Sequence, residues 1–497
     1  ACEHGDGRAR TQWNRKLYGE DLWEAFGRLK TAFDPDWLLN PGNVCGETDM
    51  TEHLRFGAGY AFDADFDTAL DWPEENGFQG MVELCHGCGG CRGPQETTGG
   101  VMCPTFRAAE EEVQSTRGRA NALRGAMSGE LPDDPTSDEF ATEVLDLCIG
   151  CKGCKKDCPS EVDMAKLKAE VEHARHQEHG SSLRDRMLAG FEALAPIGSA
   201  LAPVANRLPK LPGASALLEK TVGIAAERDL PTFRRESLRD WFAKREGAGV
   251  PLRDADRKVL LFPDAYTTYV NPSAGKATVE LLEAANCHVR MAEVPGSGRP
   301  AHSKGFLDRA RETAEATMAE LAPAVADGWE VVVVEPSDAV MVQTDYADLL
   351  GGAASDVDDD RIAAVASATY GALEYVDAHR LDERLAFDAP AEPLTYHGHC
   401  HQKATSKDHH AVGVLRRAGY EVDPLDSTCC GMAGTFGYEA EHLSMSEAIG
   451  AILAEQAGDS PGDTVVAPGN SCRSQLEHLG VETEPPHPVE KVAAALR

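Results

Sequence analysis

The sequence predicts a chain that is mainly α-helical in its first half and α/β in its second half. Three observations predict this class. Apolar residues recur at helical spacing before residue 250, and buried-strand runs alternate with helix-like segments after residue 255. Twelve of the fifteen cysteines also fall into three tight groups. The 497 residues suffice for about three domains, and no apolar run reaches the roughly 18 residues that a membrane helix needs.

The chain is strongly acidic, with 82 Asp and Glu against 48 Lys and Arg, which gives a net charge of −34. We expect no nucleic-acid partner, because such a surface repels phosphate. Only 16 of the 48 basic residues are lysines. This composition predicts a halophilic protein, and an ordinary acidic cytoplasmic protein is the alternative. The start at Ala1 lacks the basic and apolar stretches of a signal peptide, so we expect a cytoplasmic location.

The pattern divides the chain into six segments. Leu22, Phe26, Leu29 and Phe33 predict a helix over residues 18–33, which Asp34-Pro35 ends. The expected segments are a helix-and-turn segment (1–48), an acidic Gly-rich linker (49–80), a cysteine-bearing helical domain (81–172), a helical connector (173–250) and two α/β repeats (255–350 and 390–497).

The connector carries apolar runs between Met187 and Leu208, interrupted by prolines. These runs are the packing faces of a helical spacer or, alternatively, a helix that lies on a membrane surface. The alternative to a free cytoplasmic protein is therefore one that contacts the cytoplasmic face of a membrane.

The α/β half contains an internal repeat with a period of about 133 residues. Buried-strand runs occur at Val259–Phe262 and Val331–Val334, and the segment from Val331 to Ser337 matches that from Val465 to Ser471. Each unit of this tandem repeat is a strand–helix module.

The strongest motif is Cys148-x2-Cys151-x2-Cys154-x3-Cys158-Pro159. Three cysteines two residues apart can bind one corner of a cubane, and in two-cluster ferredoxins the cysteine before proline binds the second cluster. We call these four cysteines the second cysteine motif.

A partner motif precedes it, and we call it the first cysteine motif: Cys85, Cys88, Cys91 and Cys103. Eight thiolates satisfy two [4Fe–4S] clusters. The expected ligation is crossed, so that Cys158 joins the first three cysteines and Cys103 joins Cys148, Cys151 and Cys154. Structural zinc is the alternative, although zinc sites use paired CxxC units rather than triplets.

The second repeat holds the third cysteine group, which consists of Cys400, Cys429, Cys430 and Cys472. Cysteines at the ends of successive strand–helix modules should converge on one loop face. We expect a further iron–sulfur site here, with neighbouring histidines as extra ligands or as donors to the ligands; reduced core cysteines are the alternative. In the first repeat, Asp264 and Asp338 stand opposite Cys400 and Cys472, so this degenerate repeat should bind no cluster. Cys2, Cys45 and Cys287 belong to no motif and are expected to be ordinary thiols.

Glu3-His4-Gly5-Asp6-Gly7 forms a tight turn that presents a carboxylate and an imidazole together. With the ending Phe33-Asp34-Pro35 to Leu39-Asn40-Pro41-Gly42, this segment resembles the C-terminal end of FAD-linked oxidases, the family of D-lactate and D-2-hydroxyglutarate dehydrogenases. The rest of the chain resembles the iron–sulfur half of fused members of this family: a two-cluster ferredoxin-like domain followed by cysteine-rich CCG repeats. Ser115–Asn121 is similar to the fused flavoproteins in particular.

The resemblance implies site residues and cofactors. His4 would contact the 2-hydroxy acid at the flavin ring and help remove its hydroxyl proton, Asn40 would contact the flavin, and Glu3 would bind a divalent metal that polarises the substrate. The implied cofactors are FAD and the clusters. The family's flavin-binding domain should precede residue 1, so we expect a fragment that is inactive by itself.

The resemblance implies oxidation of a D-2-hydroxy acid, D-lactate or D-2-hydroxyglutarate, with electrons relayed through the clusters to a quinone, a cytochrome or an electron-transferring flavoprotein. Two alternatives are an electron-transfer subunit of the anaerobic glycerol-3-phosphate dehydrogenase type and a thiol–disulfide reductase of the heterodisulfide reductase type. The segment 1–43 argues against the first, and the degenerate first repeat argues against the second.

Overall fold

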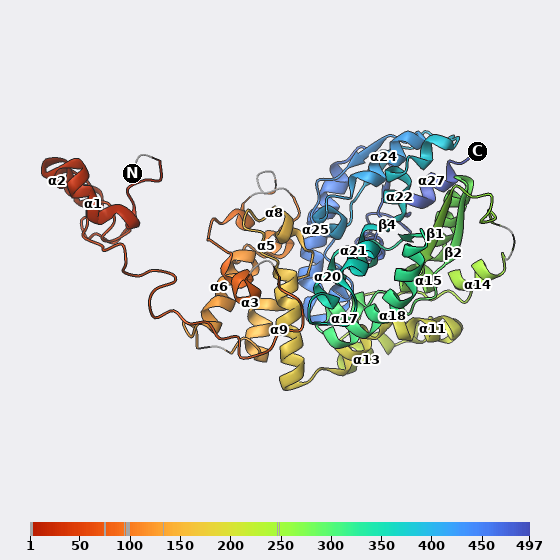
Figure 1. Ribbon diagram of the computed structural model, residues 1–497, viewed down its shortest axis with the longest axis horizontal. Coiled ribbons are helices and arrows are strands. Elements are labelled where there is room, and N and C mark those ends of the chain that lie inside the picture. Colours follow the sequence, from red (N-terminus) through yellow and green to blue (C-terminus); the bar gives the residue numbers. More distant parts are fainter. Residues whose placement is uncertain are drawn as a thin grey trace. The chain divides into compact units, whose positions relative to one another are not determined.

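The structure, a computed structural model, describes residues 3–73, 76–93, 95, 100–132, 134–245, 247 and 249–497. Cys2 lies outside the described residues. The chain divides into two compact units, Ala1–Asp63 and Ala64–Arg497, which we describe separately (Figure 1). The combination of helices with small parallel sheets confirms the predicted fold class.

The first unit is helical, with η1 (Arg8–Arg10), α1 (Thr11–Tyr18) and α2 (Glu20–Phe33). The predicted helix thus begins at Glu20 rather than at residue 18, because Gly19, with φ at +81°, separates two helices. The apolar face of α2 is largely exposed, and Phe33 is 85% accessible.

The second unit begins with a helical region that carries the first two cysteine motifs. The chain enters it along α9, where the Glu170 carboxylate accepts hydrogen bonds from the Leu70 amide (3.0 Å) and the Trp72 indole (3.2 Å). Its helices are α3 (Gly77–Glu83), η2 (Gly90–Arg92), α5 (Pro104–Ala109), η3 (Glu112–Gln114), α6 (Thr116–Met127), α7 (Asp138–Phe140), η4 (Ala141–Leu145), α8 (Gly153–Asp157) and α9 (Met164–His179).

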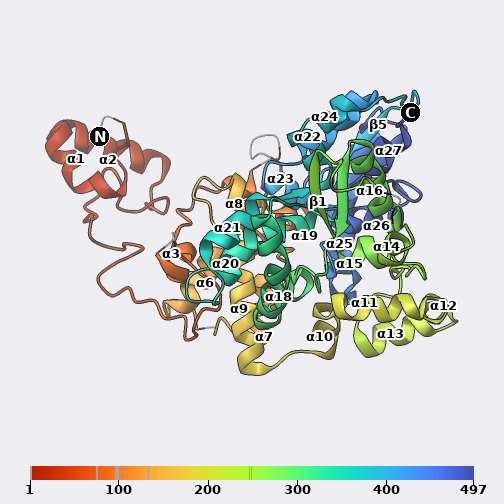
Figure 2. The ribbon, with the colours of Figure 1, turned by 45° about the vertical axis from the view of Figure 1, so that its right-hand side comes forward.

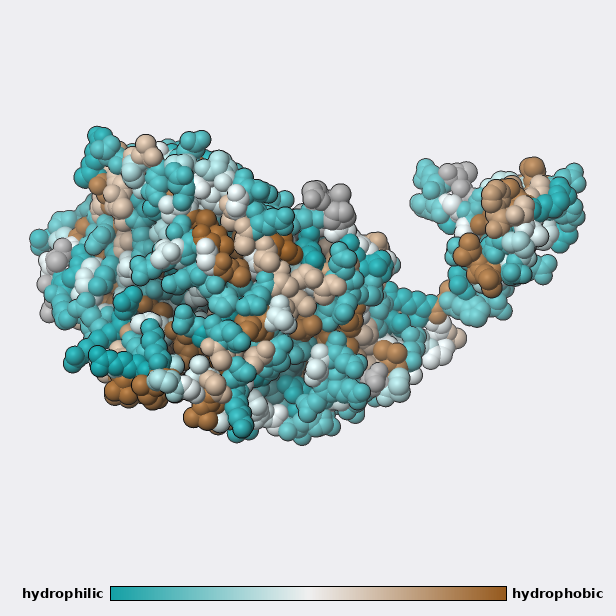
Figure 3. All heavy atoms as spheres, turned by 180° about the vertical axis from the view of Figure 1, so that it is seen from behind, coloured by the Kyte–Doolittle hydropathy of each residue, from teal (hydrophilic) through white to brown (hydrophobic). Residues whose placement is uncertain are grey.

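The segment predicted as the connector, residues 173–250, contains several helices. It contains α10 (Leu183–Ala189), α11 (Phe191–Ala200), α12 (Ala202–Ala205), η5 (Leu208–Lys210), α13 (Ala214–Val222) and α14 (Leu238–Ala243). Many of its aliphatic side chains are exposed rather than packed. Figure 3 shows brown groups along this edge of the molecule, at the lower left.

The first repeat is built on a parallel four-stranded sheet in the order β2-β1-β3-β4. Its strands are β1 (Arg257–Phe262), β2 (Cys287–Met291), β3 (Glu330–Val333) and β4 (Thr369–Gly371). The run Val259–Phe262 is fully buried, as expected of a central parallel strand covered on both faces. The helices are α15 (Ala265–Tyr269), α16 (Pro272–Ala284), α17 (Arg299–Ser303), α18 (Leu307–Ala326), α19 (Pro336–Val340), η6 (Met341–Asp345), α20 (Tyr346–Leu350), α21 (Asp359–Ser367), α22 (Ala372–Ala378) and η7 (Leu381–Arg384).

The second repeat has a parallel three-stranded sheet in the order β6-β5-β7. Its strands are β5 (Leu394–Tyr396), β6 (Val422–Pro424) and β7 (Thr464–Val466), and its helices are α23 (Cys400–Ala404), α24 (His409–Ala418), η8 (Phe436–Tyr438), η9 (Ala440–His442), α25 (Leu443–Asp459), α26 (Asn470–His478) and α27 (Pro488–Ala494). The order repeats that of β2-β1-β3, with the first strand of each repeat in the middle.

One hydrophobic core runs through both repeats. It includes Val259 and Val332 of the first sheet, Leu394 and Val466 of the second, and Val489 of α27. Figure 2 shows α16 of the first repeat beside α27 of the second. The shared core fixes the two repeats against each other, and with them the loops at the carboxyl ends of their strands.

Candidate functional site

The first cysteine motif lies against the N-terminus of α6. The Thr116 amide donates to Cys103 Sγ (3.1 Å), the Arg117 amide to Cys91 Sγ (3.4 Å), and the Asn121 side-chain amide to Cys85 Sγ (3.7 Å). Amide donors at a helix N-terminus stabilise negative charge, so this arrangement suits thiolates bound to metal. Sequence reasoning assigned no role to these donors, although they lie within the Ser115–Asn121 stretch that carried part of the resemblance.

The thiols of this motif differ in acidity. The Cys103 thiol and the Arg117 amide lower the pKa of Cys91 to about 6. The Cys91 thiol and burial raise the pKa of Cys103 well above the usual 9.0. Cys88 is exposed, whereas Cys85 and Cys103 are buried, so the first motif reaches the surface at Cys88.

The second cysteine motif is more deeply placed. Cys151 and Cys154 are buried, and burial raises the pKa of Cys154 to about 12. Metal binding must therefore displace protons from these thiols.

The two motifs are joined directly. The Asp157 carboxylate, next to Cys158, accepts hydrogen bonds from the amides of Val101 (3.1 Å) and Met102 (2.9 Å), next to Cys103. A Cβ on Gly153 would lie 2.7 Å from Val101 Cγ1, so only glycine permits this approach. The Cys103 thiol interacts directly with Cys91 and electrostatically with Cys154. Cys103 thus lies within reach of both motifs, and the crossed ligation stays a prediction.

The third cysteine group converges at the carboxyl ends of the strands of the second repeat. Cys400 begins α23 after β5, Cys429 and Cys430 follow β6, and Cys472 lies in the first turn of α26 after β7. All four side chains are buried in one cluster. Their thiols interact in sequence, Cys400 with Cys429, Cys429 with Cys430, and Cys430 with Cys472.

Glycine is required next to this cysteine pair. Gly431 has φ at +88°, and a Cβ there would lie 2.3 Å from the Ser446 carbonyl oxygen. The Gly431 amide donates to Cys429 Sγ at 3.5 Å. The Cys-Cys-Gly sequence therefore reflects a turn that brings two adjacent thiols and a backbone donor to one point.

The first repeat presents carboxyl groups at its corresponding positions. Asp338 occupies the third position of α19, as Cys472 does in α26, whereas Asp264 caps α15 and so stands one position before the counterpart of Cys400. Burial raises the pKa values of both aspartates. Burial and the Asp264 charge raise the pKa of Glu335 to about 7, and Glu335 accepts a hydrogen bond from the Asn470 amide at 2.9 Å.

The second motif and the third group are in contact. Cys151 belongs to the same buried cluster as Cys400, and the two thiols interact electrostatically. His401 Nε2 lies 3.1 Å from the Gly150 carbonyl oxygen, and Lys156 Nζ donates to the Lys403 carbonyl at 2.7 Å.

A second set of contacts runs through the first repeat. The buried Lys152 pairs with Asp345, which also accepts a hydrogen bond from Arg299 at 2.6 Å. These contacts hold the loop of the second motif in place between the two repeats.

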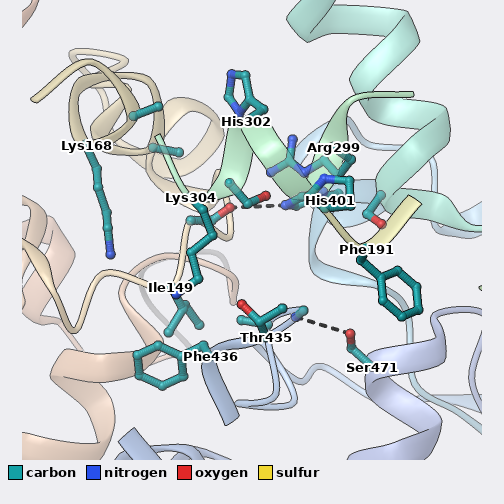
Figure 4. A pocket seen from close by; sticks show the side chains of 18 of the residues that line it. Ile149, Lys168, Phe191, Arg299, His302, Lys304, His401, Thr435, Phe436 and Ser471 are labelled. Carbon is teal, nitrogen blue, oxygen red and sulfur yellow. Dashed lines mark hydrogen bonds between the residues drawn. The ribbon is translucent and has the colours of Figure 1, made fainter. Parts of the chain in front are cut away.

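A cavity of about 240 Å³ opens between the second motif and the third group. Figure 4 shows its lining: cationic Lys168, Lys304 and Arg299 face a space bordered by the rings of Phe191 and Phe436. Cys148 lines it from one side, and all four cysteines of the third group line it from the other.

Glu439 is the centre of a charged cluster on the wall of this cavity. It pairs with Lys304, which follows α17, with Arg184 of α10 (3.3 Å) and with His442 (3.4 Å). His442 Nε2 in turn lies 2.6 Å from the carboxylate of Asp146, two residues before Cys148. Although burial opposes its charge, His442 and Lys304 lower the pKa of Glu439 to about 2.

In the first unit, Glu3 and His4 lie in an exposed turn. Asn40 is exposed and has φ at +45°. The buried Asn14 ties the Glu3–Gly7 turn to the chain just after the segment that ends at Gly42, because its side-chain amide donates to the carbonyl oxygens of Asp6 (2.9 Å) and Val44 (3.0 Å). Sequence reasoning missed Asn14, and its place in a helix gave no signal of this role.

Three stretches match known families. Residues 2–44 match the C-terminal domain of FAD linked oxidases, residues 81–162 match the 4Fe-4S dicluster domain, and residues 394–477 match the cysteine-rich domain. The chain thus contains, in this order, stretches similar to the end of an FAD-linked oxidase domain, to a 4Fe-4S dicluster domain and to a cysteine-rich domain. The recognised resemblance and the implied cofactors, FAD and iron–sulfur clusters, are thereby supported.

Relatives extend this similarity along the chain. A D-2-hydroxyglutarate dehydrogenase of Haemophilus influenzae is 26% identical over all of this chain and 51% of its own length, and one of Pantoea ananatis is 25% identical over 96% of this chain and 49% of its own length. A subunit of the anaerobic glycerol-3-phosphate dehydrogenase of Escherichia coli is 27% identical over 68% of this chain and 83% of its own length. The chain spans about half the length of the D-2-hydroxyglutarate dehydrogenases that it matches.

The residues present suit the implied clusters. The dicluster domain offers eight thiols in two groups, with amide donors aimed at the sulfurs of the first motif. The cysteine-rich domain offers four converging thiols beside a buried histidine. Sulfur ligands with amide donors to them are the environment that iron–sulfur clusters use.

Proposed function

We propose that this chain is the electron-relaying part of an FAD- and iron–sulfur-dependent D-2-hydroxyacid dehydrogenase. The observation that carries the proposal is the similarity to D-2-hydroxyglutarate dehydrogenases over the whole chain. D-2-hydroxyglutarate is the favoured substrate and D-lactate the alternative. When bound, FAD takes two electrons from the hydroxyl-bearing carbon, and the clusters carry electrons onward one at a time.

The first unit supplies residues to the substrate site in this proposal. The His4 imidazole takes the hydroxyl proton while the carbon is oxidised to the 2-oxo acid. Glu3 binds a divalent metal at the substrate, and Asn40 contacts the flavin. The exposure of Glu3 and His4 supports these roles, because the turn is open to a ligand and to further protein.

The order of the relay follows from burial and contact. The first motif reaches the surface at Cys88, so we place the entry of electrons there. The second motif follows, because its Cys151 lies against Cys400. A cluster held by the cysteines of the third group would be the last carrier, from which electrons would pass to a quinone, a cytochrome or an electron-transferring flavoprotein.

We further propose that the connector lies on the surface of an anionic membrane. Within the part of the chain that the structure describes, no helix is long and apolar enough to span a bilayer. The connector instead exposes nine aliphatic side chains: Leu183, Met187, Leu194, Ile197, Leu201, Val204, Leu208, Leu211 and Leu217. Residues 193–218 contain no Asp or Glu in this acidic chain, but they include Arg207 and Lys210. Exposed aliphatic groups beside cations suit anionic lipid headgroups.

Vesicle flotation tests the membrane proposal. The chain should float with vesicles that contain anionic lipid, and the doubly substituted Ile197→Glu, Val204→Glu variant should not. A variant with Leu252→Glu, an exposed leucine outside the connector, serves as the control. The membrane proposal would be contradicted if the unsubstituted chain, the double variant and the control bound vesicles equally. It would also be contradicted if the chain formed dimers but did not bind vesicles.

The test of the dehydrogenase proposal needs a protein that includes the flavin-binding part. His4→Ala in that protein should lower turnover of D-2-hydroxyglutarate at least about 100-fold, the scale of general-base catalysis, and leave iron and acid-labile sulfide unchanged. Unchanged turnover would exclude His4. Finding zinc and no acid-labile sulfide in the chain would exclude electron transfer through iron–sulfur clusters and would favour a structural role for the cysteines.

The alternative is an iron–sulfur electron-transfer subunit, supported by the similarity to the subunit of the anaerobic glycerol-3-phosphate dehydrogenase. It predicts that the chain accepts electrons from a separate flavoprotein that oxidises glycerol 3-phosphate. The test uses the protein that includes its flavin part and asks which compound reduces the clusters. Reduction by D-2-hydroxyglutarate but not by glycerol 3-phosphate would favour the dehydrogenase over the electron-transfer subunit.

A further inference from the structure

His397 is a buried histidine directly after β5, and none of the roles above uses it. Its side chain is fully buried, with 0% exposure. Its Nδ1 lies 2.7 Å from Ser427 Oγ, whereas its Nε2 forms no hydrogen bond of normal geometry among the described residues, and the ring interacts with the Cys430 thiol. A buried ring nitrogen that lacks a well-formed hydrogen bond is destabilising, so this position is expected to serve a ligand.

This side of the ring belongs to a group of three donor atoms. One ring nitrogen of His397 and the sulfurs of Cys430 and Cys472 all lie within 4.8 Å of one another, and all three residues are buried. Because Ser427 engages Nδ1, Nε2 is the ring atom available to a metal. Imidazole nitrogen and thiolate sulfur both bind iron, and donor atoms this close to one another could hold one metal centre.

The far side of the imidazole is held as in metal-binding histidines. Ser427 contacts Nδ1, and the buried Lys403 fixes Ser427 by donating to its carbonyl oxygen (2.6 Å) and to its hydroxyl oxygen (3.1 Å). A hydrogen bond to the second ring nitrogen sets the tautomer and the orientation of a ligating histidine. Sequence reasoning left the histidines near Cys400 as ligands or as donors, and the fixed Nδ1 favours ligation for His397.

We propose that His397 Nε2 is an iron ligand of the third site, beside Cys430 and Cys472. The third site is then a mixed histidine–cysteine centre rather than an all-cysteine one. This inference rests on the third cysteine group holding iron, as proposed above. Compared with a thiolate at the same position, a neutral imidazole brings one negative charge less and raises the reduction potential, as in Rieske centres. Electron transfer from a cluster at the second motif to the third site would therefore be energetically favourable.

Pulsed EPR on the anaerobically reconstituted chain tests the proposal. The chain is prepared with natural histidine and with ¹⁵N-histidine, and the reduced third site is examined for coupling to histidine nitrogen. We expect a strong coupling that changes with the isotope, disappears in His397→Cys and persists in His487→Gln. His487 is a matched control, because it is buried and its Nε2 also forms no hydrogen bond of normal geometry, but it lies outside the cysteine group and caps α27.

The His397→Cys variant separates ligation from packing. It supplies a thiolate in place of the imidazole, so it should keep the iron of the third site but lower its midpoint potential. His397→Ala should lose this iron, with the two dicluster sites unchanged. Iron retained in His397→Ala, or wild-type coupling no stronger than that of a hydrogen-bonded nitrogen, would overturn the inference and leave the dehydrogenase proposal intact. Absence of iron from the wild-type third site would overturn the inference together with the last carrier of the relay.

Discussion

Replacing Glu439 with glutamine should weaken the charged contacts that Glu439 makes with Lys304, Arg184 and His442 on the wall of the cavity. The lowering of its pKa from 4.5 to about 2 reports how strongly Lys304 and His442 favour its charge. At about 1.4 kcal/mol per unit, the charged contacts contribute about 3 kcal/mol. Because the side chain is 2% exposed, solvent screens this energy little. Glu439→Gln removes the charge and leaves the ammonium of Lys304 with weaker partners.

Hydrogen exchange followed by mass spectrometry measures this effect locally, which suits a chain of several domains. Residues 433–442 contain backbone amides whose hydrogen bonds should depend on these charged contacts. One example is the Ala440 amide, which donates to the Gly223 carbonyl oxygen at 2.9 Å. A loss of about 3 kcal/mol corresponds to roughly 100-fold faster exchange in this peptide. Glu441→Gln is the control, because its carboxylate is 47% exposed and its pairing should change exchange less than about threefold. Similar exchange in both variants would refute the reasoning.

The same peptide should show a defined pH dependence. Burial opposes the charge of His442, but Asp146 and Glu439 raise its pKa above 6.5, so its contribution is present below pH 6.5 and lost as pH rises through the raised value. The contribution of Glu439 is present above pH 4.5 and lost as pH falls toward 2. Protection, corrected for intrinsic exchange, should therefore be greatest between about pH 4.5 and 6.5.

Two further predictions concern the cysteine sites. Gly431→Ala should remove the iron of the third site, because its Cβ would lie 2.3 Å from the Ser446 carbonyl oxygen, whereas Gly434→Ala, also at positive φ but with open space around it, should keep that iron; equal iron analyses would contradict this. If ligation of the dicluster domain is crossed, Cys103→Ser and Cys148→Ser affect the same cluster, so the double variant should retain about four irons in that domain, whereas uncrossed ligation leaves neither cluster intact.

Much of the candidate site could be predicted from the sequence because cluster ligands occur at short, regular spacings. The triplet spacing of Cys85 to Cys91 and of Cys148 to Cys154 depends only on how a loop surrounds a cubane. Strand runs such as Val259–Phe262 were equally predictable, because a parallel strand covered on both faces needs a continuous apolar run. The start of α2 was harder to predict, because the break between the two helices depends on a single glycine, Gly19, with a positive φ.

The sequence by itself determined which residues can bind metal and which class of fold carries them, since both depend on residue type and local spacing. Only the tertiary structure decided which sites are neighbours. Cys151 meets Cys400 because a core shared by both repeats and the contacts of Lys152 and Asp345 place one loop against another. It also decided that the connector exposes its aliphatic groups and that His397 faces Cys430 and Cys472, because such juxtapositions depend on packing between segments far apart in the chain.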